Sequence, residues 1–251
     1  MRSRKTTRSE TIIITDAHVG KAAENIGAFF RMLEAFEKTD HDLIFLGDIF
    51  DLWIAMPRYE KDIHAHFSGW CREQKTNRTI GFLEGNHEFF LADEKADTFT
   101  WCAKNAWRRD HSGVLFVHGD QINRKDRMYL CFKKLTKNKI TKFILRNLPG
   151  GPSLIGSIQL GLNQLNNKYR GYIPEEEIKY FAESRFAEGI DTIFAGHFHR
   201  EYCYRNDESK ELYILPDWLS TQKITLYQER LKMVTTIHWK ELDMESKSCQ
   251  Y

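Results

Sequence analysis

Short apolar runs alternate with longer amphipathic segments along most of the chain. Five of these runs are rich in β-branched or aromatic residues, and they span residues 11–15, 43–46, 79–83, 114–117 and 192–195. Runs of this length predict strands that are buried on both faces of a sheet. Between them, apolar residues at helical spacing predict helices over residues 22–38, 60–74, 89–105 and 174–188. The pattern therefore predicts an α/β fold.

After residue 199 the pattern changes to short β-rich runs without intervening helices. These runs cover residues 201–205, 212–215, 223–227 and 232–238, and polar turns separate them. Such spacing predicts antiparallel strands.

Residues 121–172 form a long insertion between two of the predicted core strands. The insertion has a helical pattern with a break at residues 149–152, and its only acidic residue is Asp126 among many Lys and Arg residues. A basic amphipathic helix indicates a membrane surface or an anionic amphiphile, and the solvated face of an ordinary helical insertion fits equally well. We predict a core of residues 1–120 and 173–251, with residues 121–172 as a helical cap.

Charge and cysteine usage narrow the class of protein. The 251 residues carry a formal net charge of only +2, so overall charge does not favour nucleic acid, and we expect no nucleic-acid partner. Five scattered Cys residues without a Cys-x-x-Cys pair argue against a disulfide framework or a Cys-type zinc site, and for a reducing compartment. We see no signal peptide and no run of the ~18 apolar residues that span a membrane. Any membrane contact is therefore expected to be peripheral.

Metal-binding side chains follow each of the five predicted core strands. Ligands of open α/β sheets bind at the carboxyl ends of strands, so these side chains are expected to meet there. Mixed shells of carboxylate, imidazole and amide oxygen suit divalent cations, and two such cations can clamp a phosphorus centre. One motif alone is a weak signal, but five in order predict a two-metal site. The seven residues are Asp16, His18, Asp48, Asn86, His118, His197 and His199.

These five motifs together resemble the calcineurin-like metallophosphoesterase superfamily. The resemblance covers essentially the whole chain and implies a four-layer αββα sandwich with a dinuclear metal centre. It implies that Asp48 bridges two divalent ions, with Mn²⁺ expected and Fe, Zn or Mg able to occupy similar shells. By the same resemblance, the ligands of one ion are Asp16, His18, Asp48 and His199. Those of the other are Asp48, Asn86, His118 and His197.

Within this superfamily the chain resembles the UDP-2,3-diacylglucosamine pyrophosphatase family of lipid A biosynthesis. The resemblance rests on residues 47–54 and 118–120, on the pattern Asp126-x-x-Tyr129-x-x-Phe132-Lys133, on Lys168, and on Trp218 in a predicted strand. It implies that the insertion is a lipid-binding cap and that the substrate is an anionic nucleotide-linked glycolipid. The side chains implied to contact the substrate are Asn86, His87, Asp126, Lys168 and His197.

One motif departs from the narrower family. That family carries Gly-Asn-Arg-Asp where this chain has Gly85-Asn86-His87-Glu88. The His form belongs to the wider superfamily, where the resemblance implies that His87 acts as a general acid or stabilises phosphoryl charge. We expect Asp51, Glu88 and Asp120 to orient neighbouring groups, because they lie beside the predicted ligands.

The sequence therefore predicts a metal-dependent hydrolase, with His87 and Asp48 as its catalytic residues. The expected reaction converts UDP-2,3-diacylglucosamine to UMP and 2,3-diacylglucosamine 1-phosphate. It is expected in the cytoplasm, peripherally on the cytoplasmic face of the inner membrane. One alternative is a phosphoesterase acting on a soluble phosphomonoester or phosphodiester, such as a nucleotide or phosphoprotein. The other is a scaffold without catalysis, which the complete ligand set disfavours. The pattern does not give the oligomeric state.

Overall fold

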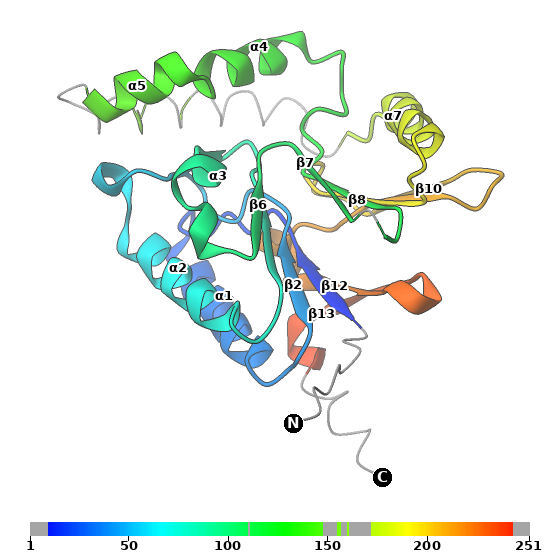
Figure 1. Ribbon diagram of the computed structural model, residues 1–251, viewed down its shortest axis with the longest axis horizontal. Helices are drawn as coiled ribbons and strands as arrows, with labels where there is room; N and C mark the ends of the chain where they lie inside the picture. The colour runs from blue at the N-terminus through cyan, green and yellow to red at the C-terminus, as the bar shows by residue number, and fades with distance from the viewer. Residues whose placement is uncertain (1–9, 110, 148–154, 157–159, 161–171, 243–251) are drawn as a thin grey trace.

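The computed structural model describes residues 10–109, 111–147, 155–156, 160 and 172–242 (Figure 1). The strands of its two larger sheets are β1 (Thr11–Ile14), β2 (Asp42–Phe45), β4 (Ile80–Leu83), β6 (Trp101–Ala103), β7 (Ala106–Arg109), β8 (Val114–Val117), β9 (Thr192–Ala195), β10 (Tyr202–Arg205), β11 (Glu211–Ile214), β12 (Lys223–Gln228) and β13 (Met233–His238). One sheet has the order β13-β12-β1-β2-β4-β6, and the other has the order β10-β11-β9-β8-β7. A parallel pair, β3 (Trp53–Ile54) and β5 (Glu88–Phe89), lies apart from both.

The α-helices with described bounds are α1 (Ala23–Phe36), α2 (Asp62–Gln74), α3 (Leu91–Glu94), α4 (Arg127–Thr136), α5 (Lys139–Asn147), α7 (Glu175–Ala187) and α8 (Trp218–Thr221). Short 3₁₀ turns occur at Pro57–Tyr59, Ala96–Thr98, Glu229–Leu231 and Trp239–Glu241. None of the described helices is long and apolar enough to cross a membrane.

Alternating side chains of the core strands build a four-layer sandwich. Ile12 and Ile14 of β1 pack into the cluster that contains the buried face of α1, whereas Ile13 faces the cluster between the two sheets. On the second sheet, Phe194 lies between the sheets and Ile193 packs toward α7. This alternation follows from the two-residue period of a strand. The predicted αββα sandwich is therefore confirmed.

Parallel pairing places the polar loops at one end of the sandwich. β1, β2 and β4 run parallel to one another in the first sheet, and β8 runs parallel to β9 in the second. Their carboxyl ends therefore share an edge, as the sequence predicts. Helices α4 and α5 lie across this end of the molecule, drawn in green at the top of Figure 1.

The predicted helix over residues 89–105 is wrong. This stretch contains the end of β5, the short helix α3, a 3₁₀ turn and strand β6. Trp101 of β6 pairs with Gly81 of β4, and a Cβ atom on Gly81 would lie only 2.1 Å from the Trp101 ring. The ring of Trp101 also stacks on that of Trp107 at 4.1 Å. Pairing and packing at the sheet edge thus outweigh a local helical pattern.

The last predicted strands are all present, with two changes of detail. β11 runs antiparallel to β10 but parallel to β9, so it continues the second sheet and not a separate meander. Trp218 begins helix α8 and does not lie in a strand. The side chain of Asp217 accepts a hydrogen bond from the Ser220 backbone N–H at 2.9 Å, and this cap starts a helix there.

The described part of the insertion includes α4 and α5. The two helices are separated at Asn138, whose side-chain oxygen accepts hydrogen bonds from the backbone N–H groups of Ile140 (2.8 Å) and Thr141 (2.9 Å) and so starts the second helix. The predicted break at residues 149–152 lies outside the described residues. The division into a core and a cap stays a prediction.

Candidate metal centre

The loops after β1, β2 and β9 hold most of the predicted ligands in a left-handed backbone conformation. Their φ angles are 52° at Asp16, 42° at His18, 53° at Asp48, 75° at His197 and 53° at His199. Each non-glycine residue in such a conformation costs about 1–3 kcal/mol and persists where the surroundings enforce it. Backbone hydrogen bonds of 3.0 Å between neighbouring loops, from Asp16 N–H to the Gly47 carbonyl and from His18 N–H to the Asp48 carbonyl, provide that enforcement.

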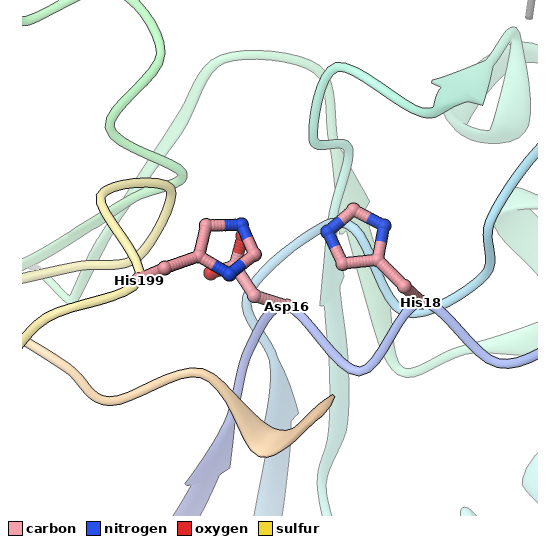
Figure 2. A group of neighbouring side chains, drawn as sticks. All are labelled: Asp16, His18 and His199. Atoms are coloured by element: carbon pink, nitrogen blue, oxygen red, sulfur yellow. The ribbon is translucent and has the colours of Figure 1, made fainter. Parts of the chain in front are cut away.

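Asp16, His18 and His199 form the first group of candidate ligands (Figure 2). Their ligand atoms lie within 4.8 Å of one another, and His199 Nε2 is 3.5 Å from Asp16 Oδ1. Asp16 Oδ1 and both ring nitrogens of His18 are buried without a hydrogen-bond partner in the part of the chain that the structure describes. Buried polar atoms normally have partners, because leaving them unpaired costs free energy. A divalent cation would satisfy Asp16 Oδ1 and one of the two ring nitrogens of His18.

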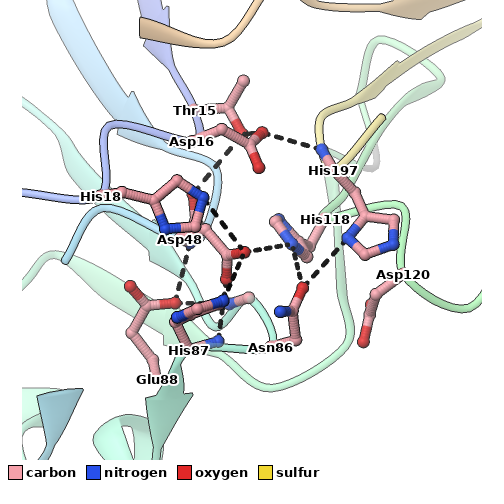
Figure 3. A network of polar contacts seen from close by, with 12 residues as sticks. Thr15, Asp16, His18, Asp48, Asn86, His87, Glu88, His118, Asp120 and His197 are labelled. Atoms are coloured by element: carbon pink, nitrogen blue, oxygen red, sulfur yellow. Dashed lines mark hydrogen bonds and ion pairs between the residues drawn. The ribbon is translucent and has the colours of Figure 1, made fainter. Parts of the chain in front are cut away.

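Asp48, His118 and His197 form the second group, and Asn86 lies between its two histidines (Figure 3). Asn86 Oδ1 is 3.1 Å from His118 Nε2 and 3.0 Å from His197 Nδ1. Asp48 Oδ2 is 3.5 Å from His118 Nε2 and 3.9 Å from His18 Nε2 of the first group. Asp48 therefore lies where a carboxylate that bridges two cations would lie.

His118 carries a proton at the position that a metal ion would take. Its Nδ1 lies 2.9 Å from the backbone carbonyl of Leu46, which can only accept, so Nδ1 donates and Nε2 faces the centre. Burial alone would lower the pKa of His118, but the Asp48 carboxylate opposes this and raises the pKa to about 10. Without metal, the Nε2 proton therefore faces the oxygens of Asp48 and Asn86.

The two other buried imidazoles have the form that metal binding requires. Burial, together with the charge of His118, lowers the pKa of His197 to about 4. Burial and the nearby His87 hold the pKa of His18 well below its usual value. Both rings are therefore neutral at pH 7, and neutral imidazole is the ligand form of histidine.

His87 lies beside the first group and faces Asp48. Its Nδ1 contacts the backbone carbonyl of Asp51, so Nδ1 donates and Nε2 points toward Asp48 Oδ2 at 3.9 Å. The ring meets that of His18 edge to face, with 4.7 Å between centroids. His18, Asp51 and His87 also have ligand atoms within 4.8 Å of one another. The Nε2 atom of His87 can thus reach a group that is bound at the centre.

Two carboxylates hold the ligands in place, and the sequence predicted one of them. Glu88 accepts hydrogen bonds from the backbone N–H groups of Gly85 (2.8 Å), Asp48 (2.9 Å) and Ile49 (2.9 Å), which confirms that it orients the loops. Asp217, which sequence reasoning missed, has its Oδ2 3.6 Å from His199 Nδ1. Asp217 lies shortly after the end of β11, and this position after a strand could have marked it as a site residue.

Of the five residues predicted to contact substrate, three lie at the metal centre. Asn86, His87 and His197 lie at the centre, whereas Asp126 caps α4 by accepting the Tyr129 N–H at 3.0 Å. Lys168 lies outside the described residues. The substrate roles of all five residues stay predictions.

His64 and His66, which the sequence did not favour as ligands, take part in packing. The ring of His64 is buried and stacks on Trp53 with 5.1 Å between centroids. His66 is exposed and stacks on Phe30 at 4.3 Å. Neither belongs to a group of candidate ligands among the described residues.

Comparison with known proteins supports a phosphoesterase. The family model of calcineurin-like phosphoesterases matches residues 10–201. The chain is 28% identical over 233 residues to a UDP-2,3-diacylglucosamine hydrolase of Azotobacter vinelandii, covering 83% of this chain and 90% of that protein. It is 27% identical to the protein of the same name from Pseudomonas fluorescens, covering 82% and 87%. A solved dimetal phosphatase from Danio rerio superposes with a TM-score of 0.44 at 10% identity, covering 92% of this chain and 99% of that one.

Proposed function

Because the chain belongs to the calcineurin-like phosphoesterase family, we propose that this metal-dependent hydrolase cleaves the phosphoric anhydride of a nucleotide-linked glycolipid. The proposed substrate is UDP-2,3-diacylglucosamine, and the products are UMP and 2,3-diacylglucosamine 1-phosphate. Relatives named UDP-2,3-diacylglucosamine hydrolase match most of the chain. The observation that carries the proposal is a helical insertion with exposed apolar side chains directly beside the metal centre.

The chemistry follows from the donor set at the centre. Two bound divalent cations would supply Lewis acidity and lower the pKa of an attacking water. Asp16, His18 and His199 would hold one ion, the second group with Asn86 would hold the other, and Asp48 would contact both. The set mixes carboxylate, imidazole and amide oxygen, which suits several divalent cations, and we propose Mn²⁺ by resemblance to the family.

His87 is the residue proposed to act on the phosphoryl group or the leaving oxygen. Its Nδ1 is anchored on the Asp51 carbonyl, which keeps the ring in one orientation. Its Nε2 faces the centre and can carry a proton to the leaving oxygen or donate a hydrogen bond to a phosphoryl oxygen.

The insertion supplies the surface proposed to meet the lipid. Met128 and Leu135 on α4 are 70% and 65% exposed, and Ile140 and Phe143 on α5 are 73% and 69% exposed. Exposed basic residues, Arg127, Lys134 and Lys139, lie along the same two helices. Apolar and basic side chains on one amphipathic element favour an anionic membrane surface. We place the enzyme peripherally on the cytoplasmic face of the inner membrane.

Substrate hydrolysis in mixed micelles tests this proposal. With Mn²⁺ present, UMP release from UDP-2,3-diacylglucosamine is measured beside hydrolysis of bis-para-nitrophenyl phosphate. We expect a strong preference for the glycolipid. Hydrolysis of the generic diester alone would keep the two-metal mechanism and overturn the substrate.

A soluble phosphoester is the second candidate substrate, because His87 stands where the narrower family carries Arg. This candidate predicts activity on nucleotides or phosphodiesters that is independent of detergent and falls steeply with salt. UMP release that requires micelles would contradict it.

A further inference from the structure

One face of helix α4 is directed at the loops of the metal centre. Tyr129 and Lys133 are four residues apart and therefore lie on the same side of the helix. The Tyr129 hydroxyl and the Lys133 ammonium both donate to Oδ2 of Asp120, the ammonium at 2.6 Å. Asp120 follows the candidate ligand His118 by two residues, so this face of α4 is tied to the loop after β8.

The next residue along the same face reaches a different loop. Lys137 is a further four residues along the chain, and its ammonium donates to the backbone carbonyl of Gly85. The same ammonium lies 4.9 Å from the centroid of the Phe89 ring. Gly85 directly precedes Asn86, so the end of α4 is tied to the loop that carries the amide ligand.

The two tied loops serve the second metal position. They supply His118 and Asn86, whose side chains lie 3.1 Å apart. The Tyr129 ring also lies 6.0 Å from the ring of His197, the remaining histidine of that group. Three candidate ligands of one position therefore depend on loops or rings that α4 contacts.

Among the described residues, the contacts that hold the first metal position come from the core. Asp16 accepts hydrogen bonds from the Thr15 hydroxyl at 2.6 Å and from the His197 backbone N–H at 2.8 Å. His199 Nδ1 lies 3.6 Å from Oδ2 of Asp217, the residue that caps helix α8. The two positions thus differ in how they are held.

We propose that α4 is a brace for the second metal position and that Lys133 and Lys137 are positioning residues for it. When α4 is docked, the loops of His118 and Asn86 are fixed and this position binds metal tightly. When α4 is displaced, the second ion is lost before the first. The proposal rests on the two-metal centre of the proposed function and is independent of the glycolipid.

Metal titration of lysine variants tests the brace. Lys133→Met and Lys137→Met keep the aliphatic stem and remove the donor. Metal-free protein is titrated with Mn²⁺ by calorimetry, and the EPR spectrum of bound Mn²⁺ is recorded. We expect one of two equivalents to bind about tenfold more weakly, as is usual when a group that orients a metal ligand is removed. At limiting Mn²⁺ the spectrum should be that of isolated ions and not of a coupled pair.

Three further variants control the experiment. Lys134→Met removes a neighbouring exposed lysine of the same helix and should leave both equivalents unchanged. Lys133→Arg keeps a donor for Asp120 and should restore most of the affinity. Tyr129→Phe removes only a hydroxyl that donates to Asp120. It therefore tests the contact between α4 and the Asp120 loop if a lysine variant does not fold.

The outcomes separate this inference from the proposed function, because the titration needs no substrate. Wild-type affinity for both equivalents in the two Met variants would overturn the brace. Equal weakening of both equivalents would also overturn it, since the helix would then stabilise the whole centre. A protein that binds neither Mn²⁺ nor Fe²⁺, Zn²⁺ or Mg²⁺ would contradict the two-metal function itself.

Discussion

The buried histidines at the centre differ in their protonation, and this difference matters for metal binding. The Asp48 carboxylate keeps His118 protonated by raising its pKa to about 10, whereas burial lowers the pKa of His18 and His197 and keeps them neutral. The sequence identified these three histidines because each follows a core strand. Their protonation could not be predicted, because it depends on the distance between His118 and Asp48, which lie in loops that follow strands of different sheets.

Mn²⁺ affinity at the second metal position is predicted to rise with pH. The pKa of His118 is raised to about 10, so at pH 7 a metal ion must displace its proton. Affinity at that position should increase by about tenfold per pH unit between pH 6.5 and 8.5, because one proton leaves per ion bound. Calorimetry in two buffers of different ionisation enthalpy measures the released proton. An Mn²⁺ affinity at this position that is equal at pH 6.5 and pH 8.5 would contradict the prediction.

Replacing His87 should separate catalysis from metal binding. His87→Ala removes a donor that faces the centre but lies outside both proposed ligand sets. Turnover on a diester should fall by about 10²–10⁴-fold, the usual contribution of a general acid. Metal analysis should still find two equivalents per chain. Unchanged turnover would remove His87 from the mechanism.

Single elements show where local patterns are reliable. The helix predicted over residues 174–188 is present as α7, because its pattern and its packing against the second sheet agree. The helix predicted over residues 89–105 fails because Trp101 joins a sheet edge. For the basic insertion, the sequence predicted the excess of positive charge but not the acidic partners of individual residues. Lys142 and Arg146 of α5 form ion pairs with Glu94 of α3, each at 2.7 Å, and the chain separation of about fifty residues hides such partners.

Helix α2 should lose stability in acid through His64. Its Nδ1 accepts the Lys61 N–H at 3.2 Å, and burial together with Lys61 lowers the pKa of His64 to about 3. The unfolded chain, with a pKa of 6.5, therefore binds the proton first, and this contribution to stability is lost as pH falls from 6.5 toward 3. At pH 5 the loss is about 2 kcal/mol.

Chemical denaturation of metal-free protein at pH 5 and pH 7 measures this effect. His64→Gln keeps a hydrogen-bond acceptor and cannot titrate, so its unfolding free energy should change less between the two pH values. A variant with the same pH dependence as the wild type would show that His64 does not titrate on unfolding.

At the scale of the whole molecule, the sequence pattern predicts an α/β fold and the position of the centre, because parallel strands share one edge and polar residues follow each of them. The four-layer sandwich was implied by resemblance to the superfamily. The course of the insertion over that edge was suggested by its start directly after His118 and by the resemblance. Its contacts with the loops of His118 and Asn86 are set by tertiary packing.

The exposed face of α4 and α5 should govern binding to anionic membranes. Ile140→Ser combined with Phe143→Ser removes two side chains that are 73% and 69% exposed. Each buried side chain of this size contributes about 1.5–3 kcal/mol, so vesicle binding should weaken by about tenfold or more. Sedimentation with anionic vesicles measures it. The matched control is Leu231→Ser. Leu231 is an apolar residue outside the insertion that is also 70% exposed, so its replacement should not change vesicle binding.

The most direct test of the two-metal centre is anomalous diffraction from crystals grown with Mn²⁺. We expect two peaks about 3.5–4 Å apart, with the Asp48 carboxylate between them. One peak should lie against Asp16, His18 and His199, and the other against Asn86, His118 and His197. A single peak, or peaks away from Asp48, would contradict the account.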